Sequence, residues 1–177
     1  MSRKLTVTMY AMFTVLGASI TLLGPTLKDL TARYDIPLAD GGIFTALHFA
    51  GSLVGIYVIG RLLDRYNPRW PMAISMLMFG VGLLALTVAP VLGLALLAAL
   101  LFGIGYGGAD IGPNALVARY AVGRSASALN LLNMFFGVGA ILSPLLVNFA
   151  HARGEFALAY AVVGALMLLL IYPMATV

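Results

Sequence analysis

The sequence contains no cysteine and very few charged residues. The absence of cysteine from all 177 residues excludes disulfide bonds, thiolate metal sites and cysteine nucleophiles. Only 9% of the residues are charged and 62% are hydrophobic, whereas a soluble domain needs about 25% charged residues. The mean hydropathy of +1.05 agrees with this imbalance. The composition therefore predicts an integral membrane protein.

Long apolar runs occupy almost the whole chain. A helix needs roughly 20 apolar residues to cross a bilayer, and six windows satisfy this length: 5–27, 41–63, 71–90, 92–118, 127–149 and 156–176. The sequence does not show the alternating segments of about 10 residues that are typical of a transmembrane barrel. We expect an all-α membrane protein in which residues 1–177 form a single domain of six transmembrane helices.

Basic residues are distributed unequally between the two sides of these spans. The side opposite the termini carries Lys28, Arg33 and Arg153, while the side that holds both termini carries Arg3, Lys4, Arg61, Arg65, Arg69, Arg119 and Arg124. Cytoplasmic loops are enriched in Lys and Arg, so we predict an inner (plasma) membrane protein with both termini in the cytoplasm. Loops that face anionic lipid explain the formal charge of +4 and leave nothing to support a nucleic-acid partner.

The two halves of the chain show a faint internal repeat. Gly24-Pro25 and Ala32-Arg33-Tyr34 are echoed by Gly112-Pro113 and Ala118-Arg119-Tyr120, and Phe49 and Gly51 by Phe135 and Gly137. The Ala-Arg-Tyr triplets and the Phe and Gly matches share an offset of 86 residues. Because three helices separate the copies, the second copy would be inverted in the membrane, as in many transporters. The pattern predicts a 3+3 inverted repeat.

Polar and aromatic residues gather on the first, second, fourth and fifth windows at steps of three or four residues. Such steps return to one face of a helix, so the four windows would share an interior surface. Amide groups bond hydroxyls, and aromatic faces cover the apolar side of a sugar ring. The candidate substrate-binding residues are therefore Asn114, Asn130, Asn133, Tyr10, Tyr106 and Phe136.

Two ionisable residues inside the apolar windows are candidates for proton coupling. A carboxylate costs several kcal/mol within a bilayer and usually faces a cavity or a partner, so Asp110 is the first candidate for proton coupling. The alternative is that Asp110 and Asn114 satisfy groups freed by a kink at Pro113. His48 is the second candidate for proton coupling, and the alternative for it is a packed interior histidine.

The loop Gly60-Arg61-Leu62-Leu63-Asp64-Arg65-Tyr66-Asn67-Pro68-Arg69 resembles the loop between helices two and three of the major facilitator superfamily, usually Gly-x-Leu-x-Asp-Arg-x-Gly-Arg-Arg/Lys. Asn67 replaces the usual glycine, which a left-handed turn tolerates, and Pro68 replaces a basic residue. The resemblance implies a gating loop that contains Gly60, Asp64, Arg65 and Arg69. It also implies that Asp64 docks on the N-terminal end of a helix in the other half of the transporter.

The stretch from Gly103 to Pro144 is similar to the sugar-permease branch of that superfamily, the fucose and glucose proton symporters. This resemblance implies a secondary active transporter of a small polar solute, a sugar with proton coupling, that works by alternating access. Asn133 stands where many relatives have histidine. Export of a drug or metabolite stays an alternative, although the fourth window lacks the arginine of many proton-driven exporters and the fifth lacks the antiporter signature.

The family normally has twelve helices in two halves, with substrate bound between them, so six helices supply half of a cavity. We expect a homodimer of half-transporters, because an identical parallel copy would regenerate the missing half. A truncated N-terminal half or a non-transporting subunit is the alternative. No His-Glu-x-x-His motif occurs and neither histidine has a nucleophile motif beside it, so we expect no enzyme activity, no metal and no cofactor. The expected partners are a small-molecule substrate, the lipid bilayer and the second copy.

Overall fold

The computed structural model describes residues 3–120, 123 and 125–176, so Arg124 of the basic count lies outside the described residues. The chain forms α1 (Arg3–Ile20), α2 (Leu23–Arg33), a short 3-10 helix η1 (Leu38–Gly41), α3 (Gly42–Arg65), α4 (Arg69–Val88), α5 (Leu92–Tyr120), α6 (Ser125–Ala152), α7 (Ala157–Leu169) and α8 (Ile171–Ala175). Five segments are long and apolar enough to cross a membrane, and α1 with α2 makes a sixth if the bent pair is one span. The predicted all-α membrane architecture is confirmed at this level.

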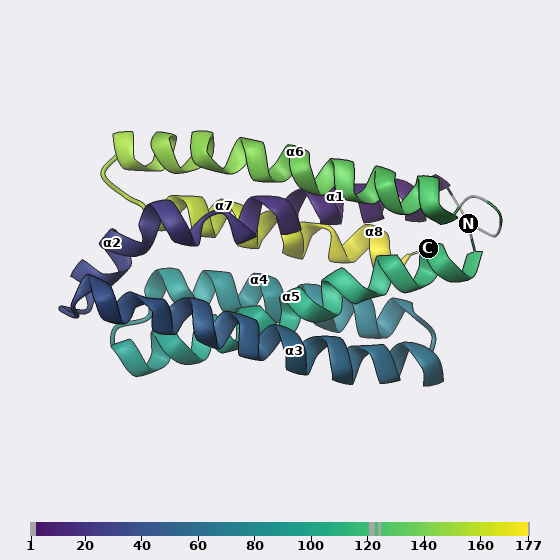
Figure 1. Ribbon diagram of the computed structural model, residues 1–177, viewed down its shortest axis with the longest axis horizontal. Helices are drawn as coiled ribbons and strands as arrows, with labels where there is room; N and C mark the ends of the chain where they lie inside the picture. The colour runs from purple at the N-terminus through teal and green to yellow at the C-terminus, as the bar shows by residue number, and fades with distance from the viewer. Residues whose placement is uncertain (1–2, 121–122, 124, 177) are drawn as a thin grey trace.

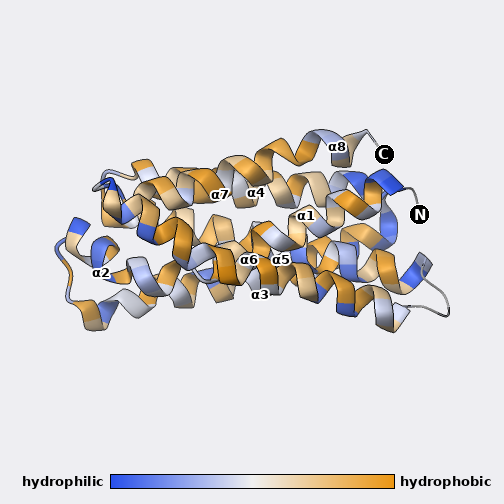
Figure 2. Cartoon of the chain, turned by 90° about the horizontal axis from the view of Figure 1, so that it is seen from above, coloured by the Kyte–Doolittle hydropathy of each residue, from blue (hydrophilic) through white to orange (hydrophobic). Residues whose placement is uncertain are grey.

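The helices form two layers. Helices α6, α1, α5 and α3 lie side by side in one layer (Figure 1), and α4 and α7 lie on one side of it (Figure 2). The most extensive helix pairings are α3 with α5, α4 with α5, α1 with α6 and α4 with α7. Both termini lie at the same end of the bundle, at the right in Figure 1. We call this the terminal end, and we call the end that holds α2 the opposite end.

The first predicted span, 5–27, corresponds to two helices, since α1 and α2 are bent by 53° at a short break. Pro25 lacks a backbone N–H and is tolerated in the first turn of a helix but not in its interior. Thr21 Oγ1 lies 3.2 Å from the carbonyl oxygens of Gly17 and Ala18, and so supplies a donor to carbonyls at the break. The last predicted span is likewise interrupted at Leu170, between α7 and α8.

Glycine residues bring the paired helices into close contact. A Cβ atom at Gly103 of α5 would clash with the carbonyl group of His48 in α3, and a Cβ atom at Gly17 of α1 would clash with the carbonyl group of Phe136 in α6. Small residues at such positions let membrane helices approach closely. The glycine run of α5 therefore serves packing, and α5 continues as one helix through Pro113.

Candidate functional site

Asp110 and Asn114 lie on the side of α5 that faces away from α4, beside the face that packs on α3. A Cβ atom at Gly108 would meet Ile59 of α3 and Ser75 of α4, and one at Gly112 would meet Met72 of α4. Two residues along a helix correspond to about 200° of rotation, so Asp110 projects opposite to both glycines and Asn114 opposite to Gly112. Both side chains are half-buried.

Pro113 lacks the N–H that would bond the Ala109 carbonyl, and the side-chain bond beside it involves a different carbonyl, that of Asp110. The Asn114 side-chain amide donates to the Asp110 backbone carbonyl at 3.0 Å, while no described residue hydrogen-bonds the Asp110 carboxylate. The carboxylate is therefore not engaged in closing the backbone beside Pro113. It remains available to a proton, an ion or a substrate hydroxyl.

Two of the three predicted residues of α6 lie on its outer surface. Asn130 and Asn133 are exposed, and the Asn133 amide donates to the Leu129 carbonyl at 2.9 Å. Phe136 is half-buried where α6 contacts α1. Its neighbour Phe135 stacks on Tyr10 of α1, with ring centroids 4.7 Å apart and planes at 9°. Phe135 was missed by the sequence reasoning as a site residue, although it stood in the repeat.

His48 lies inside the bundle rather than on an open face. Its side chain is 1% exposed, and no described group hydrogen-bonds either ring nitrogen. Its ring stacks on Phe102 of α5 at 4.5 Å and meets the edge of Tyr106 at 5.0 Å. Tyr106 lies one helical turn before Asp110 on α5, so Tyr106 contacts His48 of α3 and lies on the same side of α5 as Asp110.

The predicted gating loop is tied to the end of α5. Arg119 forms an ion pair with Asp64 through Nη2 and donates from Nη1 to the Leu63 carbonyl at 3.3 Å. Arg65 is exposed. No atom of the described residues lies near the position that a Cβ would take at Gly60. Arg119 was missed as a partner of the loop, although the repeated Ala-Arg-Tyr triplet had marked it.

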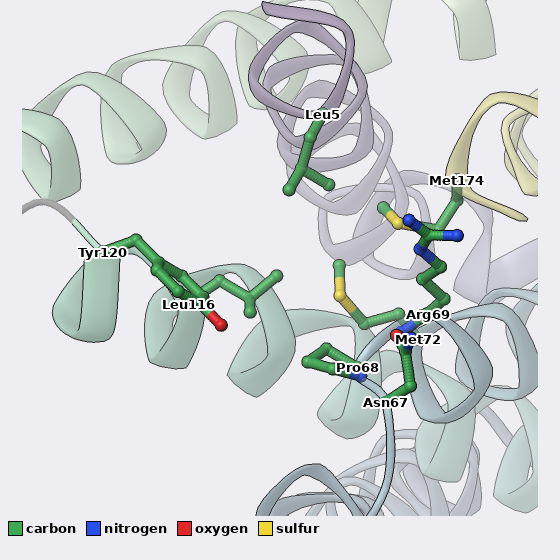
Figure 3. A pocket seen from close by; sticks show the side chains of 8 residues that line it. All are labelled: Leu5, Asn67, Pro68, Arg69, Met72, Leu116, Tyr120 and Met174. Carbon is green, nitrogen blue, oxygen red and sulfur yellow. The ribbon is translucent and has the colours of Figure 1, made fainter. Parts of the chain in front are cut away.

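A cavity of about 220 Å³ opens at the terminal end beside this loop. Its lining joins α1, the α3–α4 connection, α4, α5 and α8, as Figure 3 shows: Leu5, Asn67, Pro68, Arg69, Met72, Leu116, Tyr120 and Met174. Within the loop, the Arg69 N–H donates to Asn67 Oδ1 at 3.2 Å. None of the predicted substrate-binding residues lines this cavity.

Two side-chain bonds join helices at the opposite end. The hydroxyl groups of Thr26 in α2 and Tyr160 in α7 lie 2.5 Å apart and are buried. His151 Nε2 of α6 lies 2.9 Å from Asp29 Oδ2 of α2, and both side chains are partly exposed. Sequence reasoning found neither pair, because contacts between residues more than 100 positions apart leave no local pattern.

Comparison with known proteins identifies the family. The profile described as Major Facilitator Superfamily matches residues 9–177. The chain is 30% identical over 142 residues to the sodium-dependent glucose transporter 1A of Mus musculus, a match that covers 80% of this chain and 33% of that protein. It is 29% identical over 140 residues to the sodium-dependent glucose transporter 1 of Homo sapiens, covering 79% of this chain and 27% of that protein.

A bacterial relative gives a similar match. The uncharacterized MFS-type transporter YfiU of Bacillus subtilis is 26% identical over 129 residues, which cover 72% of this chain and 25% of that protein. The matches thus span a quarter to a third of the length of these relatives. The family profile covers nearly the whole of this apolar, helical chain. The chain belongs to the major facilitator superfamily of membrane transporters.

Proposed function

We propose that this chain is one half of a secondary active transporter that moves a small polar solute, of the sugar class, by alternating access. The observation that carries the proposal is the placement of Asp110 and Asn114 on the side of α5 away from α4. An ionisable group within a membrane span usually faces a cavity or a pathway. The exposed amides of Asn130 and Asn133 on α6 would extend the same polar surface.

Asp110 is the proposed site of proton coupling, because its carboxylate has no hydrogen-bond partner among the described residues. A proton can then bind or leave without breaking a structural bond. His48 is a proposed relay, since Tyr106 lies between it and Asp110. Its buried ring would have to gain a partner to carry charge, and that cost makes Asp110 the primary site.

Coupling to sodium is a second candidate, because two of the relatives are named sodium-dependent glucose transporters. A carboxylate with nearby amide oxygens also suits a hard cation that prefers oxygen ligands. Asp110 and the Asn114 side-chain oxygen are the groups that this alternative would use. The two couplings differ in one measurable respect, which is the ion gradient that drives accumulation.

The helix contacts support an inverted repeat. Gly17 in α1 and Gly103 in α5 are 86 positions apart, and each faces a carbonyl, of Phe136 and of His48. In the same way, a Cβ atom at Gly139 of α6 would clash with Thr14 of α1, and a Cβ atom at Gly51 of α3 would clash with Leu100 of α5. Thus α1 packs on α6 as α5 packs on α3, which is the relation expected of two inverted copies.

We further propose that two identical chains assemble in parallel, with the terminal end in the cytoplasm of the cell and the transporter in the plasma membrane. The basic residues of the terminal end favour that orientation. The four-helix layer of α6, α1, α5 and α3 is the proposed dimer face, because it is not covered by α4 or α7 (Figure 2).

The test uses the full chain reconstituted in liposomes, with D-glucose as the first probe. We expect accumulation driven by an inward proton gradient and lost in Asp110→Asn. Accumulation that follows a sodium gradient instead, with no response to protons, would select the sodium alternative. Absence of accumulation for a panel of hexoses, pentoses and polyols under both gradients would contradict sugar transport, and export of a dye would point to the exporter alternative.

A further inference from the structure

We propose that His151 and Asp29 form a proton-operated latch at the outer end of the bundle. In this inference, protonation of His151 from outside holds α2 against α6, and loss of that proton frees α2 to move. The inference rests on the alternating-access function and orientation proposed above, and it adds a proton-binding site distinct from Asp110. It concerns the opening of the outer end rather than the energy source of transport.

The geometry places a titratable pair between two elements that are otherwise joined weakly. His151 Nε2 and Asp29 Oδ2 are 2.9 Å apart, and the two side chains are 40% and 35% exposed, so protons from solution reach them. Helix α2 makes only slight contact with α6. It is also set off from α1 by the 53° bend. The start of α2 is tied to α7 by the buried Thr26–Tyr160 pair, so movement of the part of α2 that carries Asp29 would pivot about this bond.

The pair is placed like the Arg119–Asp64 pair, because each binds the C-terminal end of one helix to a helix of the other half of the chain, although Asp29 and Arg119 are not equivalent positions of the repeat. His48 and Phe136, which face equivalent glycines, are 88 positions apart, and the same shift carries Leu63 to His151. In the first case the end of α3 is bound by the last turn of α5. In the second, the end of α6 is bound by α2, the last part of the first span.

The two pairs differ in one chemical property. An arginine stays charged at every physiological pH, so the pair at the terminal end is permanent as far as protons are concerned. Histidine changes charge between about pH 5 and 8. Protonated His151 attracts the Asp29 carboxylate, whereas neutral His151 retains at most one hydrogen bond from Nε2 and loses the charge attraction. The outer pair is therefore the one that responds to pH.

Other charged groups at this end are engaged elsewhere or exposed. Arg33 donates to the Thr87 carbonyl at 2.8 Å, and Arg153 lies over the Phe149 ring at 4.4 Å. The Tyr160 phenol of α7 is held by Thr26. The remaining ionisable residues of the α2 region and of the α6–α7 connection are Lys28, Asp35, Asp40 and Glu155, and none forms an ion pair with another described residue.

The absence of cysteine allows a direct distance measurement. We would introduce Ala32→Cys on α2 and Asn148→Cys on α6, both at exposed positions, attach nitroxide labels, and measure the spin–spin distance in liposomes at about pH 5.5 and about pH 8. A single short distance is expected at the lower pH. At the higher pH the population at longer distance should rise about two- to fivefold, the range that an exposed ion pair supports.

Matched variants identify the group responsible. His151→Gln and Asp29→Asn should each remove the pH dependence, while His151→Lys should hold the short distance at both pH values because its charge persists. Arg153→Gln is the control and should behave as the parent. A pH-independent distance in the parent, or a pH shift that persists in His151→Gln, would overturn the latch. The measurement needs no transport, so failure of driven uptake would contradict the proposed function and leave this result standing.

Discussion

Arg119 at the end of α5 binds the end of α3 twice, through an ion pair with Asp64 and through a hydrogen bond of 3.3 Å to the Leu63 carbonyl oxygen. The last carbonyls of a helix have no partner within the helix, and a cation is favourable at that end. One guanidinium thus satisfies both the loop carboxylate and the helix terminus. The loop motif is thereby connected to the second half of the chain.

Asp64→Asn should change the preferred state of the transporter more than its stability. The pair is exposed, with side chains 46% and 66% accessible, so its loss should cost less than about 1 kcal/mol of unfolding free energy. Asp64 is also proposed to dock on the N-terminal turn of α6 in the second copy, where a carboxylate is worth about 0.3–1 kcal/mol. We expect a shift toward states open to the cytoplasm.

Labelling of single cysteines from each side of the membrane measures this shift. Arg65→Gln is the matched control, because Arg65 is exposed in the same turn as Asp64 and has no ion pair among the described residues. Equal labelling rates in Asp64→Asn and in the parent would refute the gating role.

Asp110→Asn should abolish proton-driven accumulation while it leaves the melting temperature nearly unchanged. The physical reason is that the carboxylate closes no backbone group, because the bond beside Pro113 comes from the Asn114 amide. Asn114→Ala is the contrasting variant and should lower the unfolding free energy by about 1 kcal/mol. If Asp110→Asn instead melts early and Asn114→Ala does not, the carboxylate has a structural role and the coupling assignment is wrong.

Gly139→Ala should destabilise the bundle, and Gly137→Ala should not. A Cβ atom at Gly139 would clash with the Thr14 carbonyl of α1, whereas Gly137 has no atom within 4 Å of that position. Overpacking of this kind costs about 1–3 kcal/mol, while alanine in a helix is favoured over glycine by about 0.5–1 kcal/mol. Thermal melting in detergent compares the pair, and equal melting temperatures would show that α1 and α6 do not meet at Gly139.

This contrast also shows where sequence reasoning succeeded and failed. The sequence repeat aligned Gly51 with Gly137 at an offset of 86. In the helix packing, however, the glycine that meets its neighbouring helix as Gly51 does is Gly139, at an offset of 88. The apolar windows predicted the spans because hydropathy depends on composition alone. The register between helices depends on which glycine meets which backbone, and in a chain with 20 glycines that choice is made by packing in three dimensions.

The bend between α1 and α2 was missed for a related reason. Pro25 and Thr21 stand inside a continuous apolar window, and a window average does not register the loss of one backbone donor. Residue type and helical spacing place the proton-coupling candidate Asp110 and the substrate-binding candidate Asn114 on one face. Neither property could predict that Asn114 would bind the Asp110 carbonyl or that Arg119 would reach Asp64.

His48→Phe should raise the free energy of unfolding by about 1 kcal/mol. The substitution removes two buried nitrogens that have no hydrogen-bond partner among the described residues, and such groups are costly. It also keeps an aromatic ring against Phe102 and Tyr106. Uptake separates the two roles of His48: loss of driven accumulation by a stabilised variant supports the relay, and full accumulation assigns His48 to packing.

The proposed transport function depends on the assembly of two copies. If two copies form the transporter, the protein in mild detergent should behave as a particle of about 37 kDa of polypeptide, twice the 18.6 kDa chain. The same face then contributes twice around a two-fold axis, and an asymmetric solute cannot satisfy both copies at once. Calorimetry should therefore give one bound solute for two chains, with two equivalent orientations in the site.

Light scattering supplies the mass of the particle. A cross-link between Met134→Cys residues of the two copies, which lie on the exposed surface of α6, tests whether this face forms the dimer. A monomer that transports, or one that binds one solute per chain, would contradict the dimer, whereas a monomer without binding would favour a missing second half.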